Sequence, residues 1–427
     1  MIRWIASLTR SASSPRLALL ICLGLASCAP LRPGPTIPGL PDREPTVRVG
    51  LVVDSSQVEV GATSDYQILD ASGRVLHRLN VAERAMVRAS ADGVLIIRIG
   101  DTQTRAGQSL VVRPAASGFV NIAGEPYRGT ALIRATGPDR LTAINQVDME
   151  NYLLGVVPFE IGRVGPELLE AAKAQAVAAR TYAIRYLGRR AEFGFDVYAT
   201  VQDQVYGGAS GEHDPVSRAV QETAGEILIF GNEPIEAYYH STCAGQTAAI
   251  EEVWPQEDPE PYLVSIVDRD PRTGEAFDIS SNRFRWTQRW SASELEDILD
   301  RTLADSLPQG AESVGELRDF EVLQRTTSGR IRTLRITTST ATFDVGGDRI
   351  RWIFLTPSGS ILNSSRFDIT TVRDSEGRVI EVAAEGGGWG HGIGMCQVGA
   401  MGRARAGQQY RNILETYYPG TRIVDLY

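Results

Sequence analysis

Short alternations of apolar and polar residues characterise the first part of the chain. Between Thr46 and about Leu141, β-rich runs such as 47–53, 94–99 and 110–113 are separated by Asp, Gly and Ser residues that are typical of turns. Short strands joined by tight turns pair in the antiparallel sense. The pattern therefore predicts a β-rich N-terminal part over residues 46–140.

The apolar period changes at Gly165-Pro166, and residues 167–190 then predict the clearest helix of the chain. Pro166 at its start, acids in its first turn and arginines near its end agree with the rules for helix boundaries. Its seven alanines indicate close packing against backbone on several sides, so we expect a central helix; they are Ala171, Ala172, Ala174, Ala176, Ala178, Ala179 and Ala183.

A second helix is predicted at residues 291–303, followed by strands at 317–323, 331–336 and 351–355. The chain shows no repeat of fixed period. The predicted fold class is α+β, mostly antiparallel β with a central Ala-rich helix. Residues 141–427 are assigned to the second part of the protein, and 281–350 are a candidate inserted subdomain within it.

The N-terminus carries the features of an export signal. Three arginines precede the apolar run 17–26, which is too short to span a bilayer but suits the core of a signal peptide. Residues 1–27 are therefore predicted to be a lipoprotein signal peptide, because Leu25-Ala26-Ser27-Cys28 resembles the bacterial lipobox. The alternative is an ordinary signal peptide with a chance cysteine. Residues 28–45 are rich in proline and indicate an extended tether.

The signal and its flanking residues define an expected location. Lipidation of Cys28 would leave the protein attached to a membrane by its lipid anchor alone, at the periplasmic face of the cell envelope. Ala29 in the second position of the processed chain favours the outer membrane, by resemblance to lipoprotein sorting.

Charge and composition narrow the ligand class. The formal net charge is −9, so the protein has no basic excess with which to neutralise phosphates, and nucleic-acid binding is disfavoured. No Gly-Lys dipeptide occurs, which excludes a Walker-type phosphate loop. Only one of the 43 basic residues is a lysine, Lys173; all the others are arginines.

Six segments resemble the SpoIID/LytB family of bacterial cell-wall proteins; they are residues 151–160, 172–183, 239–245, 362–367, 388–400 and 417–421. The resemblance implies binding of peptidoglycan glycan strands. It also implies lytic transglycosylase activity on strands stripped of stem peptides, or, for other members, enhancement of a cell-wall amidase. One departure is Phe159-Glu160-Ile161, where Ser-Glu-Met is common in the family.

Glu160 is the predicted catalytic residue. A lytic transglycosylase closes the C6 hydroxyl of the muramic residue onto C1, so one carboxyl group can serve first as the acid and then as the base. Hydrolytic glycosidases need two carboxyl groups. Pro158, Phe159 and Ile161 are expected to exclude water from Glu160 and to raise its pKa. Without the family resemblance, this glutamate would be interpreted as a solvated loop residue.

Six residues are predicted to bind the substrate: Lys173, Arg180, Tyr239, His240, Trp389 and His391. Lys173 and Arg180 lie on one face of the central helix, where Arg180 could hold Glu160 or a substrate carboxylate. The alternatives are a helix-surface cation for Lys173 and a buried structural arginine for Arg180. Trp389 and His391 lie in a glycine-rich loop that could let sugar rings approach its backbone, although a tight structural turn explains the same residues.

Two cysteines remain after Cys22 in the signal peptide and the lipidated Cys28 are set aside. They are Cys243 and Cys396, and each has a histidine close in sequence, His240 and His391. The four residues could form a Cys2His2 site for a structural zinc ion. In an oxidising compartment the two cysteines could instead form a disulfide. The glycan chemistry itself requires no cofactor.

Three functional hypotheses follow from the sequence. The first is an exported lipoprotein that cleaves glycan strands and leaves 1,6-anhydro-muramic ends. The second is a glycan-binding enhancer of a cell-wall amidase that has no activity of its own. The third is a zinc-dependent cell-wall hydrolase. Glu160 distinguishes them, because only the first hypothesis needs it as a proton donor.

Lipidation at Cys28 is testable directly. We expect mass spectrometry of the membrane fraction to find a diacylglycerol-modified N-terminal cysteine, and Cys28→Ala to abolish membrane attachment. An unmodified N-terminus produced by cleavage at another position would contradict the prediction.

Overall fold

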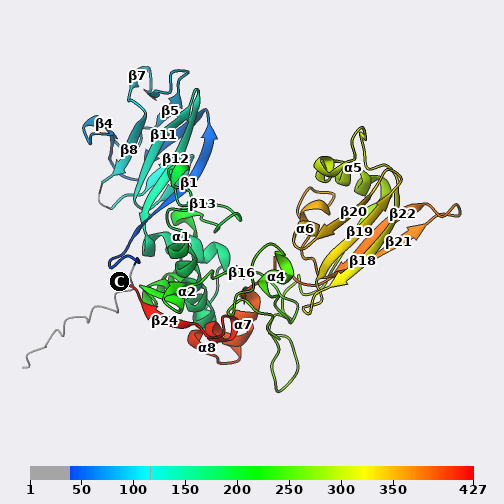
Figure 1. Ribbon diagram of the computed structural model, residues 1–427. Helices are drawn as coiled ribbons and strands as arrows, with labels where there is room; N and C mark the ends of the chain where they lie inside the picture. Colours follow the sequence, from blue (N-terminus) through cyan, green and yellow to red (C-terminus); the bar gives the residue numbers. More distant parts are fainter. Residues whose placement is uncertain (1–38, 116) are drawn as a thin grey trace, which may run out of the picture. The chain divides into compact units, whose positions relative to one another are not determined.

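The computed structural model describes residues 39–115 and 117–427 (Figure 1). The predicted signal peptide, Cys28 and most of the predicted tether lie outside these residues. The α+β class is confirmed, because antiparallel sheets dominate and helices pack around one central helix. None of the helices in the described ranges has the length and apolar character needed to span a bilayer.

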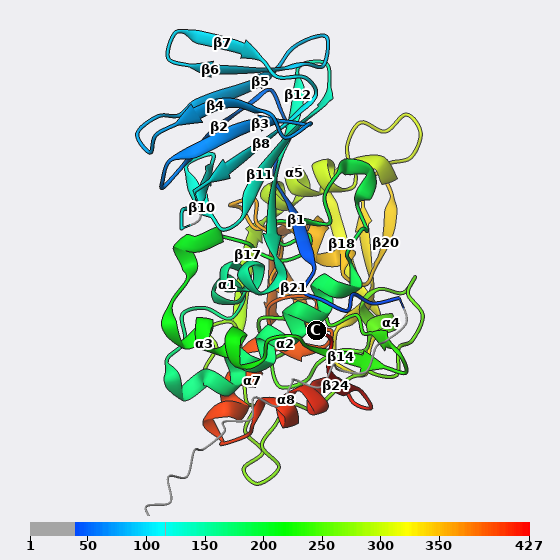
Figure 2. The same cartoon turned by 90° about the vertical axis from the view of Figure 1, so that its left-hand side faces the viewer.

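Two antiparallel sheets form the N-terminal part, as the sequence predicts. They contain the blue-to-cyan strands of Figures 1 and 2. The larger sheet has the order β13-β1-β12-β11-β8-β3-β4, and the smaller has β10-β9-β2-β5-β6-β7; only β1 and β13 pair in parallel. The strands are β1 (Thr46–Ser55), β2 (Gln57–Ala62), β3 (Tyr66–Asp70), β4 (Val75–Leu79), β5 (Ala85–Ala89), β6 (Leu95–Ile99), β7 (Thr102–Arg105), β8 (Ser109–Pro114), β9 (Val120–Ile122), β10 (Glu125–Tyr127), β11 (Thr130–Gly137), β12 (Arg140–Asp148) and β13 (Val197–Tyr198).

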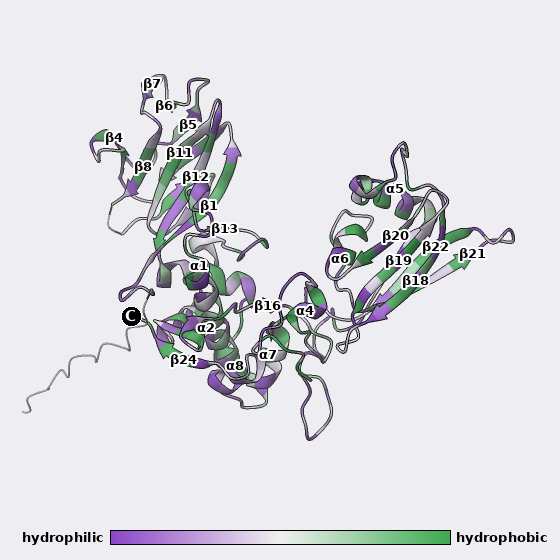
Figure 3. Ribbon diagram, in the orientation of Figure 1, coloured by the Kyte–Doolittle hydropathy of each residue, from purple (hydrophilic) through white to green (hydrophobic). Residues whose placement is uncertain are grey.

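Alternate residues of these strands face the core. Val47 and Val49 of β1 and Val58 and Val60 of β2 are buried, and they belong to one apolar cluster that both sheets share. Figure 3 shows hydrophobic (green) and hydrophilic (purple) stretches along the same strands. The period-2 pattern of the sequence therefore determines which face of each sheet is buried.

The central helix is α2 (Leu169–Arg185), preceded by the 3₁₀ turn η1 (Pro166–Leu168). All seven predicted alanines are fully buried. The helix contacts neighbours on several sides, because alanine lets backbone approach closely; these are α1 (Met149–Glu160), α3 (Asp214–Glu222), α7 (Gln397–Arg405), α8 (Tyr410–Tyr417) and the strand β14 (Glu226–Phe230), which pairs with β15 (Glu233–Pro234) and β24 (Arg422–Asp425).

A second apolar core is formed by residues from Trp290 to Ala384. The sequence placed the end of a candidate inserted subdomain at residue 350, whereas this core continues through the later strands. Its elements are β17 (Trp286–Ser291), α5 (Ala292–Thr302), β18 (Leu317–Arg325), β19 (Ile331–Thr338), β20 (Thr342–Gly346), α6 (Arg349–Ile353), β21 (Phe367–Arg373) and β22 (Val379–Gly386). Further short elements are η2 (Ala191–Phe193), η3 (Gly208–Gly211), α4 (Ile250–Val253) and η4 (Ala304–Ser306).

One predicted helix of this region is confirmed and one predicted strand is wrong. α5 begins with a capping box in which Ser291 and Glu294 satisfy each other's backbone N–H groups. Residues 351–355, predicted as a strand, instead include the end of α6. Arg351 pairs with Asp348 one turn earlier, and Ile350 and Ile353 are buried together. A short, largely apolar run does not distinguish a buried strand from a buried helical turn.

The glycine-rich loop, residues 386–394, connects the second core to β23 and α7. It leads into β23 (Met395–Cys396), which pairs in parallel with β16 (Tyr239–His240). Gly394 has a φ of +69°, and a Cβ atom there would lie 2.1 Å from the carbonyl oxygen of Tyr238. At Gly390 a Cβ atom would lie 2.8 Å from the Cβ of His240. The loop therefore needs glycine where it packs directly against the 238–240 segment.

Candidate functional site

A cavity of about 540 Å³ lies where the glycine-rich loop meets the end of α1. Its walls come from several stretches of chain that are distant in sequence, including α6 of the second core. The lining residues are Phe159, Glu160, Tyr182, Val201, Gln202, Asp203, Val205, Tyr238, Tyr239, His240, Ser241, Trp254, Asp348, Arg351, Trp352, Ile361, Trp389, Gly390, His391 and Gln397.

Glu160 is the last residue of α1. Pro158 in the final turn and Gly162, with a φ of +82°, end the helix here. One carboxylate oxygen, Oε1, accepts the backbone N–H of Val205 at 2.7 Å. The other, Oε2, accepts Nε2 of Gln397 at 3.4 Å. The carboxyl group is thus held from two sides within the cavity wall.

Burial raises the pKa of Glu160 from 4.5 to about 7. The surrounding protein disfavours the charged form, and this outweighs the hydrogen bonds from Val205, Gln397 and Tyr239, which lower the pKa. No arginine or lysine among the described residues forms an ion pair with Glu160. The group therefore holds a proton near neutral pH, as a general acid must.

A hydrogen-bonded group of side chains supports this wall of the cavity. Gln204 is fully buried and donates to the hydroxyl of Tyr239 at 2.9 Å, while its amide oxygen accepts the hydroxyl of Tyr152 at 3.1 Å. Gln397 also donates to Oε1 of Gln175 at 3.4 Å. These contacts fix the polar groups that surround Glu160.

Four of the six residues predicted to bind substrate do line the cavity: Tyr239, His240, Trp389 and His391. Their contact with a substrate stays a prediction. His391 is held in place by backbone, because Nε2 donates to the carbonyl of Tyr239 and Nδ1 accepts the N–H of Ile393, each at 3.0 Å. Burial lowers the pKa of His391 to about 4, so the ring is neutral at physiological pH.

Two tryptophans present exposed rings at this cavity. Trp389 is 43% exposed, and the guanidinium of Arg283 lies 4.9 Å from the centre of its ring. Trp352 on α6 is 53% exposed, and its indole N–H donates to Asp348. Exposed aromatic faces beside a cavity are suited to stacking against sugar rings.

The two predicted helix cations do not line the cavity. Arg180 is fully buried and forms a bidentate pair with Glu150 at 2.8 and 2.6 Å, and it also donates to the carbonyl of Glu226. Its expected contact with Glu160 is absent from the described residues. The structural role that the sequence left open is the one observed.

Lys173 forms an ion pair with Glu170 of α2 at 3.0 Å and another with Glu222 of α3 at 2.8 Å. The second pair joins α2 to α3. The sequence selected the wrong face of α2 for the site. Gln175 and Tyr182 lie on the face of α2 that is directed toward the cavity. Tyr182 lines the cavity, and the amide oxygen of Gln175 accepts a hydrogen bond from Gln397.

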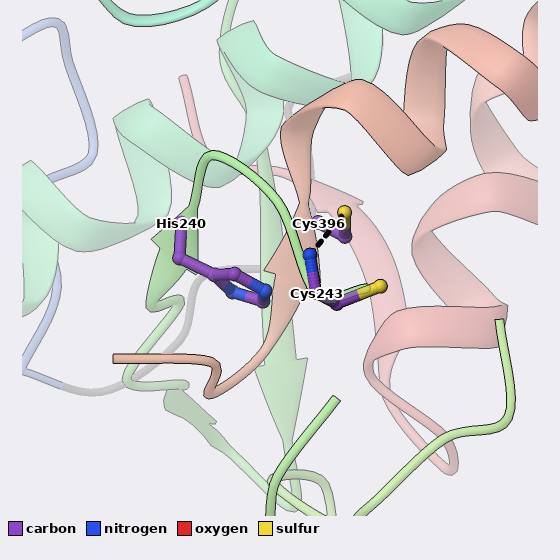
Figure 4. A group of neighbouring side chains, drawn as sticks. All are labelled: His240, Cys243 and Cys396. Atoms are coloured by element: carbon purple, nitrogen blue, oxygen red, sulfur yellow. Dashed lines mark hydrogen bonds between the residues drawn. The ribbon is translucent and has the colours of Figure 1, made fainter. Parts of the chain in front are cut away.

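The two cysteines, Cys243 and Cys396, lie next to each other at the end of the glycine-rich loop. Ring nitrogen and sulfur atoms of His240, Cys243 and Cys396 lie within 4.8 Å of one another (Figure 4). Both cysteines are free and fully buried, and the backbone N–H of Cys243 points to the sulfur of Cys396 at 3.3 Å. The predicted proximity is confirmed for these three residues.

The fourth predicted ligand is wrong. His391 uses both ring nitrogens for backbone hydrogen bonds and is absent from the cluster. Two buried aspartates that the sequence did not indicate, Asp268 and Asp278, lie beside Cys243 instead. Asp268 is already bound by Arg403 and by the hydroxyl of Tyr417, whereas Oδ1 of Asp278 has no partner among the described residues.

Several residues of the cavity wall escaped the sequence analysis. Gln397 directly follows Cys396 within a recognised motif and could have been found there. Asp348, Arg351 and Trp352 lie outside the motifs, and the last two belong to the segment 351–355 that was predicted as a strand, so no local signal placed them at the site.

Comparison with known proteins gives two family matches. The family described as "Stage II sporulation protein" matches residues 138–230, and a domain of unknown function, DUF8618, matches residues 272–394. The second match covers the whole second core and the glycine-rich loop as far as Gly394.

Three relatives align over most of the chain. An uncharacterised protein of Brachyspira hyodysenteriae is 32% identical over 67% of this chain and 69% of its own length. Stage II sporulation protein D of Bacillus subtilis is 31% identical over 66% of this chain and 76% of its own length. The amidase enhancer of Bacillus subtilis is 30% identical over 74% of this chain but only 47% of its own length.

The raised pKa of Glu160 predicts a pH-dependent stability. The unfolded chain loses the Glu160 proton near pH 4.5, and the folded protein loses it near pH 7. The contribution of Glu160 to the free energy of unfolding of the wild type therefore falls as the pH rises between those values. In Glu160→Gln the side chain is neutral at every pH, so this variant does not lose stability through ionisation at residue 160. We expect the Tm of the variant to exceed that of the wild type increasingly from pH 4.5 to 7.5. Glu167→Gln, at an exposed position, is the control; a constant difference between Glu160→Gln and the wild type across this range would contradict the assignment.

Proposed function

The chain belongs to the SpoIID/LytB family, and from this premise we propose that it binds peptidoglycan glycan strands and cleaves them as a lytic transglycosylase. The family supports a function at the cell wall. The reaction, the glycan substrate and the anchoring of the protein by a lipid on Cys28 at the periplasmic face of the outer membrane are parts of the proposal.

In the proposed reaction Glu160 acts twice. Its protonated carboxyl group donates a proton to the glycosidic oxygen as the bond from C1 of the muramic residue breaks. The C6 hydroxyl of the same residue then attacks C1 and forms the 1,6-anhydro ring. The Glu160 carboxylate accepts the proton that this hydroxyl loses, which returns the group to its starting state.

The observation that carries this proposal is the difference between Glu160 and the other acids of the cavity. Asp203 pairs with Arg190 at 2.8 Å, and Asp348 pairs with Arg351 at 3.0 Å. Among the described residues that line the cavity, only Glu160 is a carboxyl group without a cationic partner. A site with one carboxyl group free to exchange protons fits an intramolecular attack better than a hydrolysis that needs two.

The alternative of a non-catalytic enhancer is favoured by one observation, the similarity to a relative named amidase enhancer. In that case the cavity would bind glycan without cleaving it. A zinc hydrolase is supported less well, because Cys243 and Cys396 are fully buried. A catalytic zinc site must keep one position open to its substrate.

Replacing Glu160 separates the first two functions. Glu160→Gln keeps the shape of the side chain but cannot donate and recover a proton, so we expect the yield of 1,6-anhydro ends from peptide-stripped strands to fall by at least ~10²-fold. Binding of the strands should persist. The measurement is mass spectrometry of the soluble products.

The conservative control is again Glu167→Gln, which should retain full turnover. If the wild type releases no anhydro ends while it binds glycan, the enhancer function replaces the proposed one. Normal turnover by Glu160→Gln would show that another group supplies the proton.

We also propose a structural zinc ion held by His240, Cys243 and Cys396. The residues fit this ion, because Nδ1 of His240 lies 3.1 Å from the carbonyl of Ile393 and, as a donor to it, leaves Nε2 as a buried atom with no partner. A histidine oriented in this way by its other nitrogen is the usual form of a metal ligand. The ion would tie the 240–243 segment to the start of α7.

The zinc proposal predicts about one equivalent of bound metal per chain. Removing it with a chelator should lower the Tm and expose two thiols to titration under native conditions. Purified protein with two free thiols and no metal, or a disulfide that withstands the chelator, would contradict the proposal.

A further inference from the structure

A second cavity, of about 770 Å³, lies on the second core, where the glycine-rich loop begins. Three arginines, two aromatic rings and the first glycines of the loop surround it. Its lining residues are Arg285, Trp286, Thr287, Arg325, Gly329, Arg366, Phe367, Asp368, Glu385, Gly386 and Gly387. All of them fall in the region that matches the domain of unknown function.

Two of the three arginines, Arg285 and Arg366, form no ion pair with an acid in the part of the chain that the structure describes. Arg325 pairs with Asp368. Arg366 donates through Nη1 to the carbonyls of Cys243 and Ala244, and Arg285 donates through Nη1 to the carbonyl of Phe284. In the described residues, the Nε and Nη2 donors of Arg285 and Arg366 have no hydrogen-bond acceptor.

The remaining charges near this cavity leave it positive. Glu385 is the one other acid in its wall, and it forms no ion pair within the described ranges. Free guanidinium donors around a hollow are suited to a carboxylate, which can accept two parallel N–H bonds.

The glycine-rich loop connects this cavity to the one that contains Glu160. Gly387 lines the arginine cavity and Trp389 lines the other. Two residues of extended chain span at most about 7 Å. Arg283 joins the two borders, because its carbonyl accepts the N–H of Gly388 while its guanidinium covers the ring of Trp389. An extended ligand that follows the loop can therefore reach both cavities.

We infer that the arginine cavity is a carboxylate-binding subsite for the same glycan ligand, beyond the sugar that contacts Trp389. This inference rests on the proposed function. In peptidoglycan the carboxylate has two sources, the lactyl group of a peptide-free muramic residue or the stem peptide. In both cases the ligand is peptidoglycan, and the guanidinium groups of Arg285 and Arg366 bind its carboxylate.

The test uses the Glu160→Gln protein, so that bound strands are not consumed. Arg285→Gln is added to it because the Arg285 side chain is exposed and its loss leaves both cores intact. The control is Arg289→Gln, which removes the same charge from β17, the strand that directly follows Arg285; there Arg289 pairs with Glu381. The three ligands are peptide-stripped strands, the same strands with amidated lactyl carboxylates, and strands that carry stem peptides.

We expect Arg285→Gln to weaken binding of stripped strands roughly tenfold, which corresponds to about 1.4 kcal/mol. Amidation should weaken binding by a similar factor in the Glu160→Gln protein and have little further effect once Arg285 is replaced. If the effect of Arg285→Gln appears only with peptide-bearing strands, the subsite binds the stem-peptide carboxylate.

Unchanged affinity of Arg285→Gln for all strands, or an equal loss in Arg289→Gln, would overturn the inference. Its failure is distinguishable from failure of the catalytic proposal. Anhydro ends are measured on the protein with Glu160 intact, whereas the subsite is measured by binding alone.

Discussion

The parallel pairing of Tyr239–His240 with Met395–Cys396 is the contact on which the rest of the site depends. More than one hundred and fifty residues separate the two segments, and the second core is formed by the chain between them. Their pairing places Tyr239 and Gln397 beside Glu160 and His391 in the wall of the same cavity, and it places Cys243 next to Cys396. Glycines with positive φ in the loop permit the close approach, since side chains there would collide with the 238–240 segment.

Burial gives the carboxyl group at this contact its chemistry. A buried carboxylate loses hydration, and the few hydrogen bonds to Glu160 do not compensate for that loss. The other acids that line the cavity, Asp203 and Asp348, form ion pairs with arginines, whereas Glu160 has no cationic partner among the described residues. Acids in such different surroundings can take different roles in one site, and here Glu160 is the acid suited to donate a proton.

The sequence predicted features that depend on local patterns. The seven alanines indicated the central position of α2, and the Ser291 to Glu294 spacing of a capping box fits the start of α5 where the sequence placed it. Features that depend on tertiary contacts were missed. The acids that bind Lys173 and Arg180 come from α1, α2 and α3, and no spacing within α2 shows which of its faces meets the cavity. Asp268 and Asp278 reach the cysteines only through folding.

The central claim is that burial keeps Glu160 protonated near neutral pH. A direct test is ¹³C NMR titration of protein labelled at the glutamate carboxyl carbons, with the Glu160 signal identified by its loss in Glu160→Gln. The account predicts a midpoint of about pH 7 for this signal. A midpoint near 4.5, the ordinary value for glutamate, would contradict it.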